Sequence, residues 1–338
     1  MPQGTASGSE PDTLLEVVNL RVQFGALPVV DGVSFTLRAG EVLGIVGESG
    51  SGKSVSALAV MRLLPPEATI TADRMILMGE NLLTASERRY ESLRGAAMGM
   101  IFQEPMTALN PVLTIGSQIV ETVRRHTGAS ARQARAQALD ALKRVGIPAA
   151  DQRIDEYPHQ MSGGMRQRVM IAMALACRPR VLIADEPTTA LDVTIQAQIL
   201  DLLQDLQEEY RMGTVMITHD LGVVSSFADR VMIMYAGQVV ERAAAAELFD
   251  APAHPYTEGL LASIPSTETD VDRLYTIPGM VPPPFAFPPG CRFAPRCAYA
   301  RPVCTTARPP LALVHQGDHA AACIRNSGYE FPRPEVAG

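Results

Sequence analysis

The sequence contains no hydrophobic run long enough to cross a membrane. Its longest run, Val169 to Cys177, has nine residues, about half of the ~20 that a membrane-spanning helix needs. The first residues, Met1 to Thr13, are small, polar and acidic, and they lack the positive start and apolar stretch of a signal peptide. We therefore expect a cytoplasmic protein with a loose N-terminal tail over residues 1–13.

Positive charge is also scarce. The chain has 29 Lys and Arg against 36 Asp and Glu, a formal net charge of −7. A uniformly basic surface is therefore missing, and this argues against nucleic acid as a partner. The apolar share of 47% and the charged share of 19% are ordinary for a globular protein and exclude disorder as the main state. A length of 338 residues leaves room for about two domains.

Cysteines are too few for a disulfide scaffold, but they are unevenly placed. Cys177 stands alone, whereas the other four lie within 33 residues near the C-terminus: Cys291, Cys297, Cys304 and Cys323. Because the cytosol keeps thiols reduced, such a cluster indicates a metal site rather than disulfides. Fifteen of the 26 prolines also follow residue 250. The architecture is expected to change near that point.

Up to about residue 250, short β-branched runs alternate with longer helical ones, which predicts an α/β fold with a mostly parallel sheet. Val42 to Val46, Val181 to Ala184 and Val215 to Thr218 are apolar without alternation, as expected of strands buried on both faces at the sheet centre. Leu15 to Phe24 and Val33 to Leu37 alternate apolar with polar residues. This pattern predicts a half-exposed antiparallel subdomain.

Between Ile115 and Ile154 the strand patterns stop, and Ser130 to Val145 has helical spacing with polar residues on its outer side. We expect a helical insertion there, within residues 104–165. The proline-rich run Pro278 to Pro289 cannot continue a helix or a central strand. It predicts an extended connector into a small module, residues 266–338, which is too poor in apolar residues to fold on its own core.

A phosphate-binding loop follows the first central strand. The eight residues Gly47 to Ser54 match G-x-x-x-x-G-K-[ST] and precede the helical segment Val55 to Leu64. Glycines let backbone N–H groups surround an anion, the lysine adds a charge, and the final serine can bind Mg²⁺. The sequence thus predicts a P-loop NTPase. The residues predicted to bind nucleotide and Mg²⁺ here are Gly47, Ser49, Gly50, Ser51, Gly52, Lys53 and Ser54.

Two carboxylates follow the second central strand. Asp185 and Glu186 come directly after four apolar residues, Val181 to Ala184. A buried strand that ends in this way can bring one carboxylate to Mg²⁺ and aim the other at a water beside the γ-phosphate. We predict Asp185 as the metal-shell residue and Glu186 as the catalytic base.

The segment Met161 to Arg168, with sequence MSGGMRQR, resembles the signature of ATP-binding cassette (ABC) ATPases, with Met161 where Leu is usual. Further positions of that family are matched in order over residues 14–250. The resemblance implies that Phe24 stacks on adenine, that Gln103 links metal and water, and that His219 contacts the γ-phosphate. It implies that Asp192 lies in the dimer interface. It also implies that the signature binds ATP held by a partner cassette, through Ser162, Gly163, Gly164 and Gln167.

Three further segments narrow the resemblance. Tyr157 to Gln160, His254 to Thr257 and the C-terminal cysteine pattern are similar to ATPase subunits of dipeptide/oligopeptide importers. Taken alone, His254 to Thr257 could be only a helix start after a proline. The family also serves nickel, glutathione and other small solutes. The cassette is expected to span residues 14–265.

The resemblance also implies partners. They are a second cassette, typically a paralogue, two transmembrane permease subunits and an extracytoplasmic solute-binding protein. The chain is then expected at the cytoplasmic face of the plasma membrane, with permease contacts near residues 104–111 and in the helical insertion. A soluble ABC protein of translation or DNA maintenance is the rival, but the chain has one phosphate loop and no heptad run. A second rival is a catalytically inactive, structural cassette within a heterodimer. Such subunits usually lack the base or the histidine, but both Glu186 and His219 are present here.

The four clustered cysteines are spaced C-x5-C-x6-C-x18-C. Four thiolates suit either tetrahedral Zn²⁺ or a [4Fe–4S] cluster. The spacing favours iron, because zinc modules usually use tight C-x2–4-C pairs. The resemblance to the peptide-importer ATPases also favours an iron–sulfur cluster. We expect this cluster to have a structural role. His315 and His319 lie in the same stretch and are expected on the surface.

Overall fold

The computed structural model describes residues 12–189, 192–264, 275–314 and 317–327. His315, Ala190, Leu191 and almost all of the predicted N-terminal tail lie outside them.

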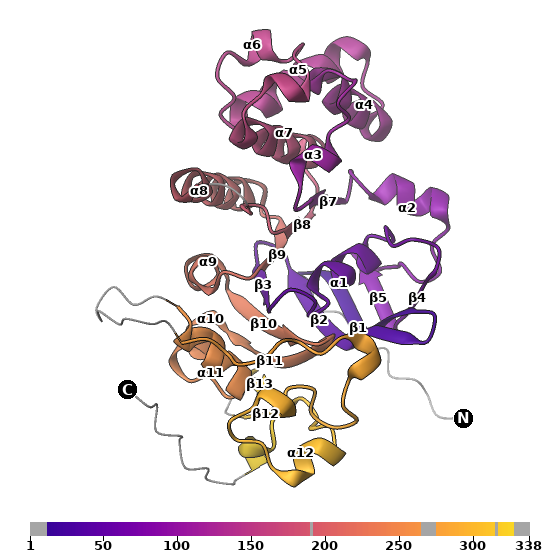
Figure 1. The fold of residues 1–338 in the computed structure, drawn as a ribbon. Helices are drawn as coiled ribbons and strands as arrows, with labels where there is room; N and C mark the ends of the chain where they lie inside the picture. The colour runs from indigo at the N-terminus through magenta and orange to yellow at the C-terminus, as the bar shows by residue number, and fades with distance from the viewer. Residues whose placement is uncertain (1–11, 190–191, 265–274, 315–316, 328–338) are drawn as a thin grey trace.

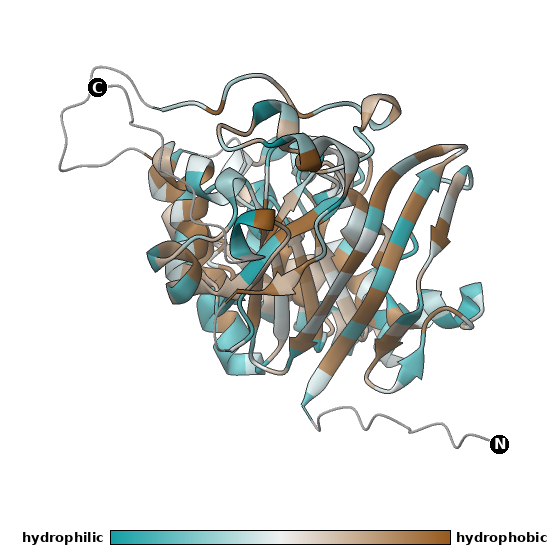
Figure 2. Ribbon diagram, turned by 90° about the horizontal axis from the view of Figure 1, so that it is seen from below, coloured by the Kyte–Doolittle hydropathy of each residue, from teal (hydrophilic) through white to brown (hydrophobic). Residues whose placement is uncertain are grey.

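The N-terminal strands form a five-stranded sheet in the order β2-β1-β5-β6, with β4 also paired to β1. Alternate residues of the β1–β2 hairpin are buried, and Figure 2 shows this as alternating bands along two long strands. The antiparallel prediction is confirmed. The strands are β1 (Thr13–Phe24), β2 (Leu27–Arg38), β4 (Ala68–Thr71), β5 (Arg74–Leu77) and β6 (Glu80–Asn81).

The second sheet has eight strands in the order β12-β13-β11-β10-β3-β9-β8-β7. The five from β10 to β7 are parallel, and every residue of β3, β8 and β9 is buried. The prediction that these three runs form the sheet centre is therefore confirmed. The strands are β3 (Val42–Val46), β7 (Met98–Ile101), β8 (Val181–Asp185), β9 (Gly213–Thr218), β10 (Arg230–Tyr235), β11 (Gln238–Ala244), β12 (Ala312–Leu313) and β13 (Ala320–Ala321).

Helices cover this sheet and extend beyond one end of it. In Figure 1, α3 to α7 gather at the top, and the C-terminal segments lie at the opposite end. Helices α3 to α6 fall within residues 104–165, where the sequence predicts the helical insertion, and α7 continues beyond residue 165. Ser130 caps α5 and exchanges hydrogen bonds with Gln133, so the predicted helix begins where its sequence signals a start. The helices up to α7 are α1 (Lys53–Val60), α2 (Glu87–Leu93), α3 (Pro105–Ala108), α4 (Ile115–Thr127), α5 (Ala131–Arg144), α6 (Ala150–Arg153) and α7 (Gly163–Leu175).

The remaining helices are α8 (Val193–Tyr210), α9 (Leu221–Phe227), α10 (Ala245–Asp250), α11 (Pro255–Ala262) and α12 (Pro302–Thr306). Short 3-10 turns add η1 (Pro158–Gln160), η2 (Pro284–Ala286), η3 (Ala294–Arg296) and η4 (Ile324–Ser327). The connector over 278–289 contains only the single turn η2, as its prolines predict. In the described part of the chain, no helix combines the length and the apolar character that a membrane span requires.

The C-terminal region packs against the cassette. The β12–β13 hairpin extends the central sheet through β11, and Phe293 packs against Tyr235 and Tyr256. The expectation that His319 lies on the surface is wrong. Its side chain is 0% exposed and Nε2 lies 2.8 Å from the buried Glu241 Oε1, because the hairpin brings it under the sheet edge.

Candidate functional site

The phosphate loop joins β3 to α1, where the sequence predicts it. Gly50 and Gly52 have φ of 79° and 96°, which L side chains rarely adopt. A Cβ on Gly47 would lie 2.1 Å from the Met234 carbonyl oxygen. These glycines are therefore required by the backbone path of the loop itself.

Lys53 is turned into the loop. Its side chain is buried, and Nζ donates hydrogen bonds to the carbonyls of Gly47, at 2.6 Å, and Glu48, at 3.1 Å. Burial lowers the pKa of Lys53, and the carboxylates of Glu186 and Asp185 act against that shift. The ammonium is thus held inside the curve of backbone that would surround a phosphate.

Two oxygen ligands suited to Mg²⁺ meet beside the loop. Ser54, in the first turn of α1, donates a hydrogen bond from Oγ to Asp185 Oδ1 at 3.0 Å. Asp185 ends β8, and its burial raises the pKa of the carboxyl. A hydroxyl and a carboxylate are hard donors of the kind that Mg²⁺ prefers. Residues 131 positions apart therefore form the pair that the two motifs predict.

Glu186 is the point at which the three predicted catalytic side chains meet. Gln103 Nε2 donates to Glu186 Oε2 at 3.1 Å, and His219 Nδ1 lies 3.3 Å from Oε1. Thr189 Oγ1 also donates to Oε2, at 2.7 Å. Sequence reasoning assigned no role to Thr189, although it opens the segment that contains Asp192. Glu186 has a φ of 46°, a strained value for a non-glycine residue. The backbone at Glu186 therefore departs from the extended conformation of β8, and this departure sets the direction of the carboxylate.

The signature segment begins a helix. Ser162 caps α7, its Oγ accepting from the Met165 N–H at 3.3 Å, and both Ser162 and Gly163 are exposed. The exposed N-terminus of a 13-residue helix favours an anion. Gln167 differs. It is 2% exposed and donates to the Pro187 carbonyl of its own chain, so the prediction that it contacts a partner's ATP does not fit its burial.

Asp192 and Phe24 lie at the ends of their elements. Asp192 caps α8, with Oδ1 accepting from the Ile195 N–H at 2.9 Å, and it is exposed. Phe24 ends β1 and is partly buried against the core. Part of its ring therefore remains uncovered by the core.

We expect Phe24→Ala to raise the dissociation constant for ATP about two- to tenfold. An aromatic stack contributes about 0.5–1.5 kcal/mol beyond burial. Equilibrium nucleotide binding to the purified chain measures the change, and Phe35→Leu, a substitution of a buried core phenylalanine on β2, is the control. An unchanged constant in folded Phe24→Ala protein would show that Phe24 serves only the core.

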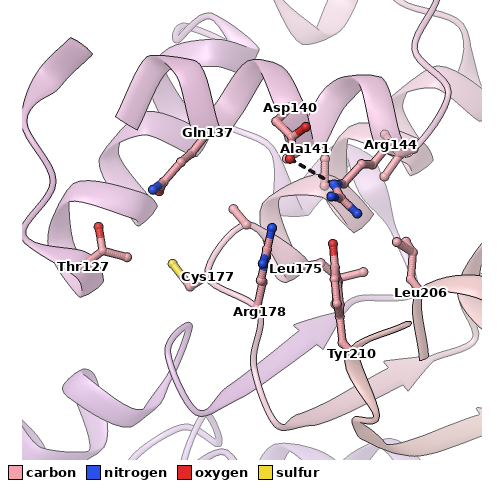
Figure 3. Close-up of a pocket in the computed structure, with 13 residues that line it drawn as sticks. Thr127, Gln137, Asp140, Ala141, Arg144, Leu175, Cys177, Arg178, Leu206 and Tyr210 are labelled. Carbon is pink, nitrogen blue, oxygen red and sulfur yellow. Dashed lines mark hydrogen bonds and ion pairs between the residues drawn. The ribbon is translucent and has the colours of Figure 1, made fainter. Parts of the chain in front are cut away.

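The predicted ATP residues are only partly accessible: Ser49 and Gly50 are exposed, whereas Ser51, Lys53 and Asp185 are buried. A cavity of about 350 Å³ lies elsewhere, between α5, α7 and α8. Figure 3 shows Arg144 paired with Asp140 at its wall, together with Tyr210 and Cys177. None of the predicted ATP-site residues lines it.

The four C-terminal cysteines share one small pocket with Phe293 and His254. Burial raises the pKa of Cys297 to about 12 and that of Cys323 to about 11. Within the described residues, however, no three His, Cys, Asp or Glu side chains are gathered closely enough to hold an ion. The thiol chemistry and the shared pocket fit a metal site. In this structure, however, the thiols are not close enough together to coordinate an ion.

Two families match the chain. The family described as "ABC transporter" matches residues 30–189, and "Oligopeptide/dipeptide transporter, C-terminal region" matches residues 240–304. A peptide import ATP-binding protein of Brucella abortus is 54% identical over 92% of this chain and 94% of its own length. The dipeptide transport ATP-binding protein DppD of Escherichia coli K12 is 50% identical over 90% and 94%.

Solved structures agree with these matches. The dimeric, post-hydrolysis ATP-binding cassette MJ0796 bound to ADP and Pi is 28% identical, with a TM-score of 0.61, over 69% of this chain and 99% of that one. The P-loop fold, the antiparallel sheet and the helical part are therefore those of an ABC ATPase, for which ATP and Mg²⁺ are expected. The chain belongs to the ABC transporter family, in the group of ATP-hydrolysing subunits that carry the oligopeptide/dipeptide transporter C-terminal region.

Proposed function

We propose that this subunit powers import of di- and oligopeptides. The observation that carries the proposal is that one chain matches both the ABC transporter family and the C-terminal region of oligopeptide/dipeptide transporters. Relatives named for peptide and dipeptide transport, at 50–54% identity over nine-tenths of the chain, support the same substrate class.

The proposed residue roles follow from the contacts. The phosphate loop and Lys53 bind the phosphates, and Ser54 with Asp185 would hold Mg²⁺, which neutralises phosphate charge. Glu186 takes the proton of the attacking water, while Gln103 and Thr189 fix its carboxylate by hydrogen bonds to Oε2. His219 is 63% exposed and lies 3.3 Å from Glu186 Oε1, and we propose that it contacts the γ-phosphate.

Two cassettes are proposed to close over the nucleotide. Ser162, Gly163 and Gly164 at the start of α7 are exposed or half-exposed and so remain free to face a phosphate held by another chain. Asp192, also exposed, would lie in that interface. We propose a paralogue as the second cassette. The dimeric form of the MJ0796 cassette supports pairing as such.

Membrane partners complete the proposed transporter. They are two permease subunits and an extracytoplasmic solute-binding protein, with this chain at the cytoplasmic face of the membrane. We propose permease contacts at residues 104–111 and on the helices α3 to α6. We also propose that residues 14–265 act as the cassette, with residues 104–165 as its helical insertion, and that residues 266–338 act as a C-terminal module.

Transport by the assembled complex tests this function. The chain is purified with its co-expressed permeases and binding protein, reconstituted in vesicles, and supplied with ATP and labelled peptides, nickel or glutathione. We expect ATP-dependent uptake of peptide, which Lys53→Ala abolishes by weakening ATP binding about 10- to 100-fold, since a lost charged hydrogen-bond donor costs about 1.5–3 kcal/mol. Uptake of nickel or glutathione without peptide would overturn the substrate assignment.

We also propose that Cys291, Cys297, Cys304 and Cys323 hold a [4Fe–4S] cluster with a structural role, with Zn²⁺ as the alternative. Their common pocket and their thiol chemistry support this. A cluster bound there would draw the thiols together and tie α12 to the segment that carries Cys323.

Metal analysis after anaerobic purification separates these options. We expect about four iron and four sulfide per chain, lost in Cys304→Ser, which removes the buried thiol, and kept in Cys177→Ser. One zinc per chain without iron rules out the cluster. A metal-free chain rules out both sites.

A further inference from the structure

The second residue of the phosphate loop carries a charge that the nucleotide would repel. Glu48 follows Gly47, and its side chain is about 31% exposed. A carboxylate beside a bound triphosphate raises the free energy of the complex unless a cation neutralises it. The structure supplies one from a distant part of the chain. Arg296 Nη1 lies 3.0 and 3.1 Å from the two Glu48 carboxylate oxygens.

Arg296 is held firmly in that position. Its side chain is 6% exposed, Nε donates to the Pro278 carbonyl at 2.8 Å, and Nη2 donates to the Ile277 carbonyl at 3.2 Å. Nη1 also lies 3.4 Å from the Tyr235 hydroxyl. A guanidinium whose three nitrogens all have acceptors has one orientation, so it presents a fixed charge to Glu48.

The backbone of Glu48 has its own partner. The Glu48 N–H donates to the Tyr256 hydroxyl at 2.9 Å. Tyr256 is fully buried in α11, in edge contact with Tyr235 at a centroid distance of 4.7 Å. His254 caps the same helix, and burial lowers its pKa to about 3, so it caps as the neutral form. The motif His254 to Thr257 is therefore a helix start that also contacts the phosphate loop, through the Tyr256 hydroxyl.

A second arginine supports the loop indirectly. The Ser51 carbonyl accepts from the Gly237 N–H at 2.9 Å, so the β10–β11 turn backs the loop. Arg292 donates to the Ala236 carbonyl of that turn and to Asp31 Oδ2 at 3.0 Å. The C-terminal region thus contacts the loop directly at Glu48 and indirectly through this turn.

We propose that Arg296 is a positioning residue for the ATPase reaction, which neutralises Glu48 and, with Tyr256, holds the phosphate loop in the conformation that accepts nucleotide. The C-terminal region is then part of the nucleotide site as well as of the transporter. This inference rests on the proposed ATP site.

The test is a double-mutant cycle on the full chain, with the dissociation constant of MgATP as the readout. Arg296→Ala raises that constant about tenfold, because Glu48 is left as an unpaired negative charge. Glu48→Gln alone changes it less than about threefold, and the double variant returns to the Glu48→Gln value. In the assembled transporter, Arg296→Ala raises KM and leaves kcat within about twofold.

Controls make each outcome decisive. Arg325→Ala removes another arginine of the same region, which pairs with Glu258 at 2.8 Å, and it leaves the constant unchanged. If Arg296→Ala does not fold, Arg296→Gln keeps an amide donor at the level of Nε, toward the Pro278 carbonyl, and has the same expected effect. An additive cycle, or an unchanged constant in Arg296→Ala while Lys53→Ala weakens binding, overturns the inference alone. An unchanged constant in Lys53→Ala overturns the ATP site and the inference with it.

Discussion

Glu186→Gln is expected to lower ATP turnover by about 10²- to 10⁴-fold, the usual contribution of a positioned general base. The amide cannot take a proton from the attacking water. It keeps the size of the side chain and an acceptor oxygen for Thr189 and Gln103, so the site is not otherwise rearranged. ATP binding is therefore retained, and two cassettes that close over ATP are expected to stay closed.

Two measurements check this expectation. Steady-state phosphate release gives the turnover, and size-exclusion chromatography of the cassettes with ATP gives the closed dimer. Asp201→Asn, a carboxylate-to-amide change at an exposed position on α8, is the control and leaves both unchanged. Turnover by Glu186→Gln at the wild-type rate would show that another group activates the water.

The largest effect on stability is expected for Glu241→Ala. Glu241 lies on β11 with its side chain 0% exposed. Its oxygens accept from the Ala253 N–H at 2.6 Å and the His254 N–H at 2.9 Å, and His319 Nε2 lies 2.8 Å away. Removal leaves the two backbone N–H groups buried without an acceptor, which costs about 1–3 kcal/mol for each of them.

Chemical denaturation measures that loss as a lower free energy of unfolding. The matched control is Glu247→Ala, because Glu247 also faces His319, at 3.7 Å from Nδ1, but is about 35% exposed. A partly exposed ion pair contributes at most about 1 kcal/mol. Equal losses in the two variants would mean that the buried contacts around Glu241 do not hold the C-terminal hairpin to the sheet.

Several features of this protein could be predicted from contiguous residues. The phosphate loop depends on glycines at fixed offsets, since Gly50 and Gly52 need left-handed backbone wherever the loop occurs. The central strands could be predicted because strands buried on both faces are uniformly apolar. The start of α5 could be predicted because Ser130 and Gln133 are local capping residues.

Burial of single polar side chains could not be predicted in this way. Gln167 belongs to a signature that is exposed at Ser162 and Gly163, but the helical turn directs it inward to the Pro187 carbonyl. His319 directly follows the polar Asp318, and the pairing of β13 with β11 buries it. In both cases the burial depends on a neighbouring element distant in sequence, so no local pattern signals it.

What the sequence determined by itself was the chemistry available: a phosphate loop, paired carboxylates, a signature and four clustered thiols. The tertiary structure alone decided which groups meet. Gln103 reaches Glu186 across 83 residues, and Arg296 reaches Glu48 across 248. Such pairs form only when parallel strands place their carboxyl ends at one sheet edge and the C-terminal chain returns to that sheet. The physical reason is that contact between distant residues is set by the packing of whole elements, whereas motifs report only local backbone geometry.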